Sequence, residues 1–528
     1  MAAARSKRVG RFARRGTLGV AVLLLVGLAA ATLPSGCSYI ELPGGIVVNF
    51  PGFSGEPMAE ADIEQRVRVP EGFSISVWAS GIESARIMRF TSAGDLLVSS
   101  PGEGKVFLLE GDTTGTGHSG GTRVLLEGLN LPHGLWLDGE TLWIAETDAV
   151  ARVPFDAKAR RVTGPLERVV RGLPTGGNHY TRTIVIGPDR RLYVAIGSSC
   201  NVCIEEDARR AGIVSYALDG TGERIFATGL RNPVGIAFRP GTDELWATDN
   251  GRDLLGDDFP PCELNRVVAD GHYGWPFASG ARVPDPDFGE DNAAAVAGSL
   301  LPAHAFGAHT APLGLVFGDQ LAFPAPWREA IFVALHGSWN RRAKQGYQVV
   351  ALLPGGKDQF REEPFVTGFE SDNEVAGRPV DVAAGPDGAL YISDDFTGQI
   401  YRVAWGEGGR ADLAPGRSSA GSGAVAAANG AAPSPVAAPA ADPFAGASAE
   451  ERERARGTGA QLWNESGCAA CHQPGAPGAP YRPLVGLRAK WDVARLTKWL
   501  AAPKPPMPRY PFDDAQRRAL ALWLLETF

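Results

Sequence analysis

The sequence predicts a mainly β chain: a six-bladed β-propeller, then a flexible linker and a small all-α domain. Three observations lead to this prediction. One pattern of paired apolar strands recurs six times between residues 65 and 405. The segment 408–447 is dominated by Ala, Gly, Pro and Ser, which have little to bury and predict a linker. Two helical patterns, roughly 449–466 and 513–526, follow it.

Length and composition agree with several globular domains. At 528 residues the chain is too long for one ordinary core, so two or three domains are expected. Its 67 glycines and 40 prolines favour many turns and short strands. Lysine and arginine total 51 against 59 acidic residues, and the resulting net charge of −8 argues against nucleic acid as a partner.

Residues 1–37 have the pattern of an export signal. A stretch rich in arginine and lysine precedes the apolar run "LGVAVLLLVGLAAATL". The following "PSGCS" resembles a lipoprotein cleavage box that would leave Cys37 as the lipidated first residue, although Pro34 stands where that box usually has leucine. An ordinary signal peptide or an uncleaved anchor is the alternative. We expect a periplasmic protein, anchored to a membrane through Cys37, with residues 38–64 as a tether.

The repeated pattern between residues 65 and 407 predicts six propeller blades. Turn pairs such as Pro-Asp and Asp-Gly separate its alternating apolar strands, as in "IVIGPDRRLYVAI" and "DVAAGPDGALYIS". Spacings between successive copies are 45, 50, 52, 79 and 66 residues, counted between Phe90, Leu135, Val185, Ala237, Val316 and Val382. Repeats of about 40–50 residues with several strands are typical of propellers. The two longest spacings predict inserted loops that build a site on one face. A β-sandwich, the alternative, does not explain six similar hairpins in one run.

The C-terminal stretch "NESGCAACHQPG" has the C-x-x-C-H pattern of c-type haem attachment. Cys468 and Cys471 would bind the porphyrin, and His472 would be the proximal iron ligand. A redox dithiol or half a zinc site is the alternative, but this region has no further Cys or His ligand. Met507 is the only methionine after residue 405 and is the predicted second axial ligand. Residues 448–528 therefore resemble a small cytochrome c domain carrying haem c.

The remaining cysteines are Cys200, Cys203 and Cys262. In an oxidising compartment two of these three are expected to form a disulfide. The sequence leaves open which two residues pair.

A tethered haem needs an electron donor, so the propeller is expected to hold a redox cofactor or to dock a redox partner. No G-x-G-x-x-G opens a βαβ unit, which disfavours nicotinamide or flavin on a Rossmann fold. The polar loops offer one base and several cations, a set that suits a polyanionic cofactor and hydride or proton transfer. These candidates are His179, Arg231, Asn232, Arg341 and Arg378. The acidic stretch "TDNGRDLLGDDFPPCELNRV" also suits Ca²⁺, without the EF-hand spacing.

Several strings in order resemble the soluble, propeller-type sugar dehydrogenases that use pyrroloquinoline quinone (PQQ), in particular the L-sorbosone dehydrogenase-like branch. They span residues 65–405 and include "NHYTRTIVIGPDRRLYVAIGSSCNVC", "GLRNPVGIAFRPGTDELWATDNGRD", "DGHYGWP", "LHGSWNR" and "GRPVDVAAGPDGALYISDD". The resemblance implies that His179 is the general base that takes the proton of the sugar's anomeric hydroxyl while hydride passes to PQQ. It implies that Arg231 hydrogen-bonds the quinone oxygen and that Asn232 contacts the cofactor.

The same resemblance implies a calcium ion held by the backbone carbonyls of Gly251 and Arg252 and by PQQ itself. Arg341 and Arg378 match positions that neutralise the PQQ carboxylates. Two departures stand out: Asn178 replaces an aspartate that often precedes the base, and Val380 replaces a second arginine.

The sequence as a whole predicts a quinohaemoprotein dehydrogenase. It would oxidise an aldose or a related sugar aldehyde to a lactone or acid, and electrons would pass from PQQ through the haem to a respiratory acceptor, a cytochrome or an oxidase. Two alternatives from other classes are a ligand-binding propeller with an electron-transfer module, and a calcium-dependent hydrolase of the lactonase kind.

Overall fold

The computed structural model describes residues 40–42, 46–50, 52, 54–355, 359–406, 444, 447–465, 484, 487, 491–501 and 512–527. Most of the predicted linker lies outside these residues. So do the predicted lipidation site and haem ligands, namely Cys37, Cys468, Cys471, His472 and Met507. Their roles stay predictions.

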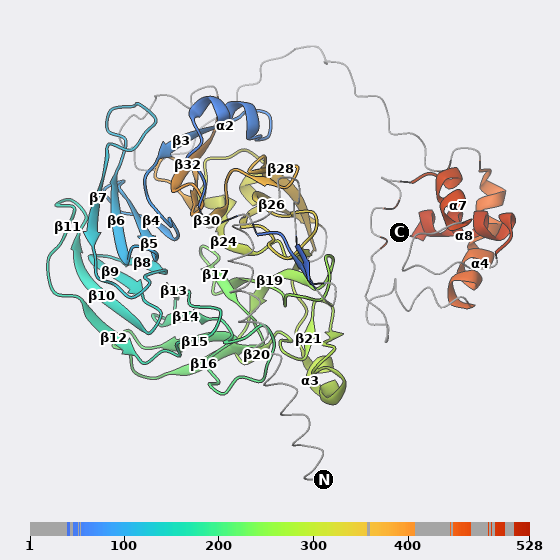
Figure 1. Cartoon of the computed structure of the whole chain (residues 1–528), viewed down its shortest axis with the longest axis horizontal. Helices are drawn as coiled ribbons and strands as arrows, with labels where there is room; N and C mark the ends of the chain where they lie inside the picture. The colour runs from blue at the N-terminus through green and yellow to red at the C-terminus, as the bar shows by residue number, and fades with distance from the viewer. Residues whose placement is uncertain are drawn as a thin grey trace, which may run out of the picture.

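Six sheets of mainly antiparallel strands form a closed ring, which confirms the predicted six-bladed propeller (Figure 1). Blade 1 contains β4 (Met88–Phe90), β5 (Leu96–Ser100), β6 (Lys105–Glu110) and β7 (Gly121–Leu126). Blade 2 contains β8 (Leu135–Asp138), β9 (Thr141–Ala145), β10 (Ala149–Asp156), β11 (Arg161–Val162) and β12 (Glu167–Arg171). Blade 3 contains β13 (Arg182–Ile186), β14 (Leu192–Ile196), β15 (Gly212–Tyr216) and β16 (Arg224–Thr228), with the short β20 (Gly271–His272) at its edge.

The second half of the ring repeats this plan. Blade 4 contains β17 (Pro233–Phe238), β18 (Leu245–Asp249), β19 (Pro261–Val267) and β23 (His304–Ala308). Blade 5 contains β24 (Pro312–Phe317), β25 (Ile331–Leu335), β26 (Gln348–Gly355) and β27 (Gln359–Val366). Blade 6 contains β30 (Pro379–Ala384), β31 (Leu390–Asp394), β32 (Gln399–Trp405) and β3 (Phe73–Ala79). The six residues used to align the repeats all lie on the innermost strand of their blade.

The ring closes because blade 6 takes strands from both ends of the domain. The early strand β3 pairs antiparallel with β32, with Phe73 opposite Trp405. The inner strands β30 and β4 then meet, so each inner strand has a neighbour on both sides. Closure of this kind leaves only short outer edges unpaired.

The core is divided among the blade–blade interfaces, one apolar cluster at each of the six. Side chains alternate between the two faces of a strand, so a blade buried on both faces must be apolar along its whole length. In β25, Phe332 and Ala334 enter the cluster shared with blade 6, and Ile331, Val333 and Leu335 enter the cluster shared with blade 4. The strands are therefore apolar at consecutive positions, whereas the sequence predicted alternating apolar residues.

Insertions account for the long repeat spacings. Between β19 and β23 the chain forms β20, β21 (Ala278–Ser279), β22 (Val283–Pro284), the 3-10 helix η2 (Glu290–Asn292) and α3 (Ala293–Gly298). Between β24 and β30 it forms the 3-10 helices η3 (Gly318–Gln320) and η4 (Trp327–Glu329), and the hairpin of β28 (Glu370–Ser371) and β29 (Glu374–Val375).

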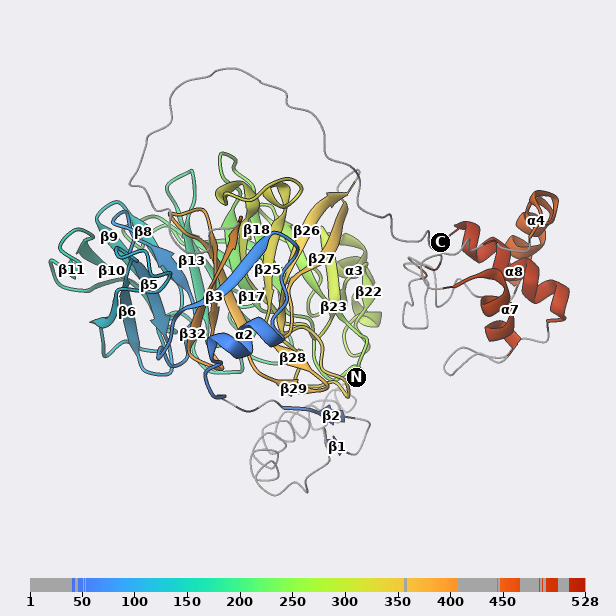
Figure 2. The same cartoon turned by 90° about the horizontal axis from the view of Figure 1, so that it is seen from above.

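The propeller packs residues that the sequence assigned to a tether. The pair β1 (Ile40–Leu42) and β2 (Ile46–Val48) is followed by α2 (Glu60–Arg66), which lies beside β3 (Figure 2). Met58, Ile63 and Val67 enter the cluster between blades 5 and 6. The packed domain therefore begins before residue 65.

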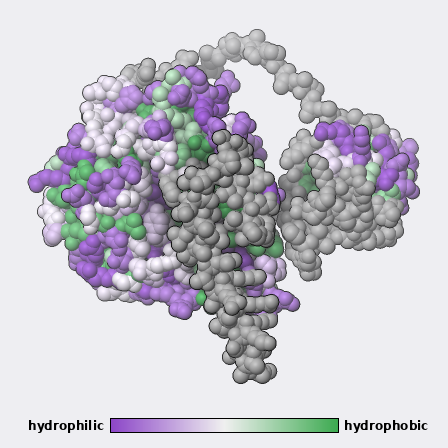
Figure 3. All heavy atoms as spheres, in the orientation of Figure 1, coloured by the Kyte–Doolittle hydropathy of each residue, from purple (hydrophilic) through white to green (hydrophobic). Residues whose placement is uncertain are grey.

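Three helices of the C-terminal segment are described: α4 (Ala449–Glu465), α7 (Val493–Ala501) and α8 (Asp514–Thr527). The first and last match the two predicted helices, and α7 was not predicted. They share an apolar core that includes Leu462, Leu496 and Leu525. Within the described part of the chain, no helix combines the length and the apolar character needed to cross a membrane. On the face drawn in Figure 3, hydrophilic side chains spread over the outer parts of the blades.

Candidate active site

A cavity of about 270 Å³ opens at one end of the propeller. Its wall comes from the loops that enter inner strands (178–181, 231–234 and 309–313) and from those that leave second strands (250–253 and 336–340). Neighbouring strands in a blade are antiparallel, so these loops all lie at the same end of the ring. The structure thus brings together residues as far apart in the sequence as Arg86 and Asn340. Of the predicted site, His179, Arg231, Asn232 and Gly251 line the cavity.

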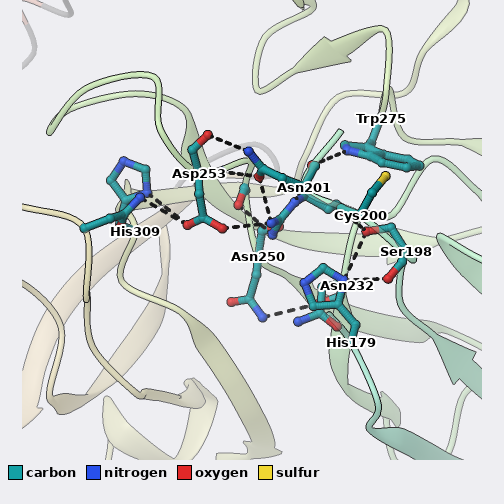
Figure 4. Close-up of polar contacts among 12 residues, drawn as sticks. His179, Ser198, Cys200, Asn201, Asn232, Asn250, Asp253, Trp275 and His309 are labelled. Atoms are coloured by element: carbon teal, nitrogen blue, oxygen red, sulfur yellow. Dashed lines mark hydrogen bonds and ion pairs between the residues drawn. The ribbon is translucent and has the colours of Figure 1, made fainter. Parts of the chain in front are cut away.

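His179 is held as a neutral imidazole in one tautomer. Its Nδ1 lies 2.8 Å from the carbonyl oxygen of Ser198 and 3.0 Å from Ser198 Oγ. That hydroxyl donates its own hydrogen to the carbonyl of Cys200 at 2.6 Å, so both Ser198 oxygens act as acceptors toward the ring (Figure 4). Nδ1 therefore carries the proton and Nε2 keeps its lone pair. A neutral imidazole with a free lone pair is the form that a general base requires.

The environment of His179 resists its protonation. Burial, followed by the positive charges of Arg231, Arg182 and Arg210, lowers the pKa of the imidazole from 6.5 to about 3. A base works only when unprotonated, so a lowered pKa keeps it competent as the pH falls. We expect kcat/KM, which reports the free enzyme, to show no acid limb from His179 between pH 8 and pH 5. A pH profile of sugar oxidation checks this, and a limb centred near pH 6.5 would contradict it.

The backbone at Gly177, at the start of the loop that carries His179, adopts a conformation and a close approach that only glycine allows without strain. Its φ is +78°, and a Cβ at this position would overlap the carbonyl oxygen of Ser199, a backbone atom with little freedom to move. Gly176 has a similar φ of +81° but open space around it. We expect Gly176→Ala to cost about 1 kcal/mol through backbone strain alone. Gly177→Ala should cost about 1–3 kcal/mol more and lower kcat by up to about 100-fold, because the loop must shift. Thermal melting and steady-state kinetics of the two variants test this, and equal behaviour would refute it.

All five N–H groups of Arg231 already have partners. Nε donates to the carbonyl of Asn201, Nη1 to the carbonyls of Asn250 and Gly251, and Nη2 to Asn201 Oδ1 and Asp253 Oδ2. The side chain is almost fully buried, 4% exposed as a residue. A direct hydrogen bond from Arg231 to a ligand would therefore require one of these bonds to be exchanged. Its positive charge acts on the cavity without any exchange.

Three predicted residues lie away from the cavity wall. Arg252 points its guanidinium at Asp285 and Asp287. Arg341 donates to the carbonyls of Ala343 and Asp257 and to Asp258. Arg378 donates to Nδ1 of His336 at 2.9 Å, which places it behind a residue that lines the cavity. Their predicted contacts with a cofactor or calcium stay predictions.

The cavity wall also contains Arg86, Asn250, His309, His336 and Asn340, which were not among the predicted site residues. Asp253, from the acidic stretch considered for Ca²⁺, lies there as well. His336 donates from Nε2 to Asp395 at 2.9 Å and accepts from Arg378, so both of its nitrogens are used. His309 donates from Nε2 to the carbonyl of Gly256, which leaves its Nδ1 unprotonated, 3.9 Å from Asp253 Oδ1.

The disulfide joins Cys200 and Cys203. This confirms that two of the three cysteines pair and settles which two. Cys262 is free and buried in the cluster between blades 4 and 5, where it behaves as a small apolar side chain.

The cavity wall is polar and lacks partners for several of its amide groups. The amide oxygens of Asn232, Asn250 and Asn340 are buried and have no hydrogen-bond partner among the described residues. Buried amide groups without partners are costly, so this wall is complete only with a polar ligand or water. The amide of Asn232 can also turn and present its NH₂ group, which would donate to a carboxylate. Arg86 and Arg231 also line the cavity, and each pairs with one carboxylate, Asp395 and Asp253 respectively.

Calcium is supported only in part. The carbonyl oxygen of Gly251 accepts a hydrogen bond from Arg231 at 2.9 Å, so a cation there would lie close to a guanidinium. Calcium takes about 6–8 oxygen ligands, more than the two predicted carbonyls provide. The site would need oxygens from a bound cofactor.

Comparison with known proteins places these features in a family. The TrAA12-like family model matches residues 67–260 and 286–406. An uncharacterized protein of Borreliella burgdorferi is 29% identical over 362 residues, covering 66% of this chain and 93% of that protein. A PQQ-dependent pyranose dehydrogenase of Coprinopsis cinerea is 25% identical over 414 residues, covering 64% of this chain and 54% of that protein. The chain thus spans about half the length of the curated pyranose dehydrogenase.

Solved structures share the propeller fold. The calcium structure of a Trichoderma reesei enzyme of family AA12 has a TM-score of 0.56 and 22% identity, covering 64% of this chain and 97% of that one. The holo form of the PQQ domain of Coprinopsis cinerea pyranose dehydrogenase has a TM-score of 0.56 and 21% identity, covering 67% of this chain and 99% of that one. At these identities the likeness shows the fold.

The family match extends over more than half of the chain. It includes the inner strand of every blade together with His179, Arg231 and Asn232. The expected kinship with propeller-type PQQ-dependent sugar dehydrogenases is confirmed at this level, since several relatives are such enzymes. The cytochrome resemblance concerns residues beyond the match. The propeller portion shows that this chain belongs to the TrAA12-like family.

Proposed function

We propose that the propeller is a PQQ-dependent dehydrogenase that oxidises an aldose or a related sugar aldehyde to a lactone or acid. The chain is an oxidoreductase by its family, and its relatives include PQQ-dependent pyranose and sugar dehydrogenases. The observation that carries the proposal is a buried, neutral His179 with a free Nε2, set in a cavity with unpaired amide oxygens and two arginines.

The chain's own residues would supply proton removal and charge. Bound PQQ would supply the acceptor for the hydride that the sugar carbon loses. His179 Nε2 takes the hydroxyl proton of the sugar, and the Nδ1 hydrogen bonds to Ser198 keep the ring in that orientation. Arg231 holds a fixed positive charge at the cavity wall, where low polarity strengthens its effect on a developing negative oxygen. The amide oxygens of Asn250 and Asn340 would accept from hydroxyl groups of the sugar, and Asn232, with its amide turned, would donate to an oxygen of the cofactor.

The finer proposal concerns the path of the electrons and the place of the protein. A haem c on Cys468 and Cys471, with His472 and Met507 as iron ligands, would accept electrons from the propeller and pass them to a respiratory acceptor. The linker 408–447 would keep donor and acceptor at high effective concentration. The signal at residues 1–37 supports a periplasmic location, with Cys37 as lipid anchor.

Reconstitution of the purified full-length protein tests this function. PQQ and Ca²⁺ are added, separately and together, and haem absorption is followed during addition of a panel of aldoses. We expect the haem to be reduced when sugar is added, and only when PQQ is present. Hydrolysis of a lactone without any electron acceptor would instead indicate the hydrolase alternative. Absence of both PQQ binding and sugar-dependent haem reduction would indicate a binding propeller.

A further inference from the structure

We propose that Asn201, at the tip of the loop closed by the Cys200–Cys203 disulfide, is a positioning residue for Arg231. The inference deepens the proposed function and rests on it for its kinetic part. It concerns a residue next to the cavity that is absent from its wall and from the predicted site.

Asn201 binds Arg231 through both its backbone and its side chain. Its carbonyl oxygen accepts from Arg231 Nε at 3.0 Å, and its Oδ1 accepts from Arg231 Nη2 at 3.0 Å. Two of the five guanidinium hydrogen bonds thus end on one residue. A two-point contact of this kind fixes the plane of the guanidinium as well as its place.

Further hydrogen bonds fix Asn201 itself. Its Oδ1 also accepts from the backbone N–H of Asp253 at 2.8 Å, and its Nδ2 donates to the carbonyl of Asp253 at 3.0 Å. The indole N–H of Trp275 donates to its carbonyl at 3.3 Å (Figure 4). The side chain therefore joins three segments: its own loop, the strand entry that carries Arg231, and the loop that carries Asp253.

The same four-residue loop also reaches the base. The carbonyl of Cys200 accepts from Ser198 Oγ, and Ser198 accepts from His179 Nδ1. The disulfide between Cys200 and Cys203 closes the loop that carries both Cys200, which contacts Ser198, and Asn201, which contacts Arg231. This disulfide-closed loop therefore links the position of the proposed base to the position of the cation at the same cavity.

The chain offers a graded set of variants. Asn201→Ala removes the side-chain acceptor and donor, and Asn201→Asp keeps an acceptor oxygen for Arg231 but loses the donor to Asp253. Cys200→Ser combined with Cys203→Ser removes the covalent closure and leaves Asn201 in place. Ile204→Ala, at a residue 57% exposed that takes no part in the hydrogen bonds of Arg231 described above, is the matched loop control.

We expect Asn201→Ala to lower kcat by about 10 to 100-fold with a smaller change in KM for the sugar, because a displaced charge acts on the reacting atoms more than on sugar binding. Asn201→Asp should recover most of that loss, the double serine variant should lie between, and Ile204→Ala should match the parent. The crystal structure of cofactor-free Asn201→Ala should show the Arg231 guanidinium displaced.

The kinetic and the crystallographic readouts distinguish a failure of this inference from a failure of the proposed function. If the parent protein oxidises no sugar, the proposed function fails, and the crystal structure still decides the positioning role. An unmoved Arg231 in that structure overturns the inference, and so does an unchanged kcat in an active protein. If Asn201→Ala fails to fold, the double serine variant decides by the same two readouts, and an unchanged kcat with an unmoved Arg231 in that variant refutes the role.

Discussion

Replacing His179 with alanine is expected to lower kcat for sugar oxidation by about 10²–10⁴-fold, the usual contribution of a positioned general base. The reason is geometric: Nδ1 is committed to Ser198, so Nε2 is the atom available to accept the hydroxyl proton. The affinity for PQQ should change far less than kcat, because the amides and arginines of the cavity remain. Stopped-flow reduction of PQQ-loaded protein by sugar, alongside PQQ titration, measures both quantities.

His304→Ala is the matched control for this prediction. His304 bonds Glu362 on the neighbouring blade and does not line the cavity. It should keep the parent rate. If His179→Ala also kept it, the base would have to be sought elsewhere, and His309 would be next, since its Nδ1 is likewise unprotonated within the cavity. His309→Gln would then show the loss that His179→Ala did not.

The fold could be predicted because its determinants are local and repeated. Each blade needs strands that are apolar on both faces and turns between them, and both features appear in every copy as sequence strings. Ring closure through β3 was harder to predict, since pairing of Phe73 with Trp405 joins positions more than 300 residues apart. Met58 and Ile63 gave no repeat signal, because α2 packs on the ring without belonging to a blade.

The site could be predicted only where one short motif carried it. His179 and Arg231 stand in strings that the resemblance aligns, and the structure puts both in one cavity. Arg341 and Arg378 stand in such strings too, but neither the resemblance nor the charge fixes the direction of a side chain: Arg341 turns to the acidic loop and Arg378 to His336. Asn201 carried no signal at all, because its importance lies in contacts with Arg231 and Asp253, which the fold creates.

Replacing Cys468 and Cys471 with alanine in one variant should remove covalent haem and with it all sugar-dependent haem reduction. The propeller should still pass electrons from sugar to a soluble dye at close to the parent rate. The described core clusters support this separation: those of the blades contain no residue after Ala404, and the helical cluster contains none before Phe444. A change in one core therefore leaves the packing of the other untouched.

Met507→Ala refines the same test, because it should keep haem bound while lowering its reduction potential, as expected when a thioether ligand is lost. Haem reduction by sugar would then slow or stop while dye reduction continues.

Retention of full haem absorption in the double alanine variant would refute the attachment site. Loss of dye reduction along with the haem would show that electrons leave the propeller only through the haem. That result would make the C-terminal segment an obligatory part of turnover, because no other acceptor could then reach the cavity.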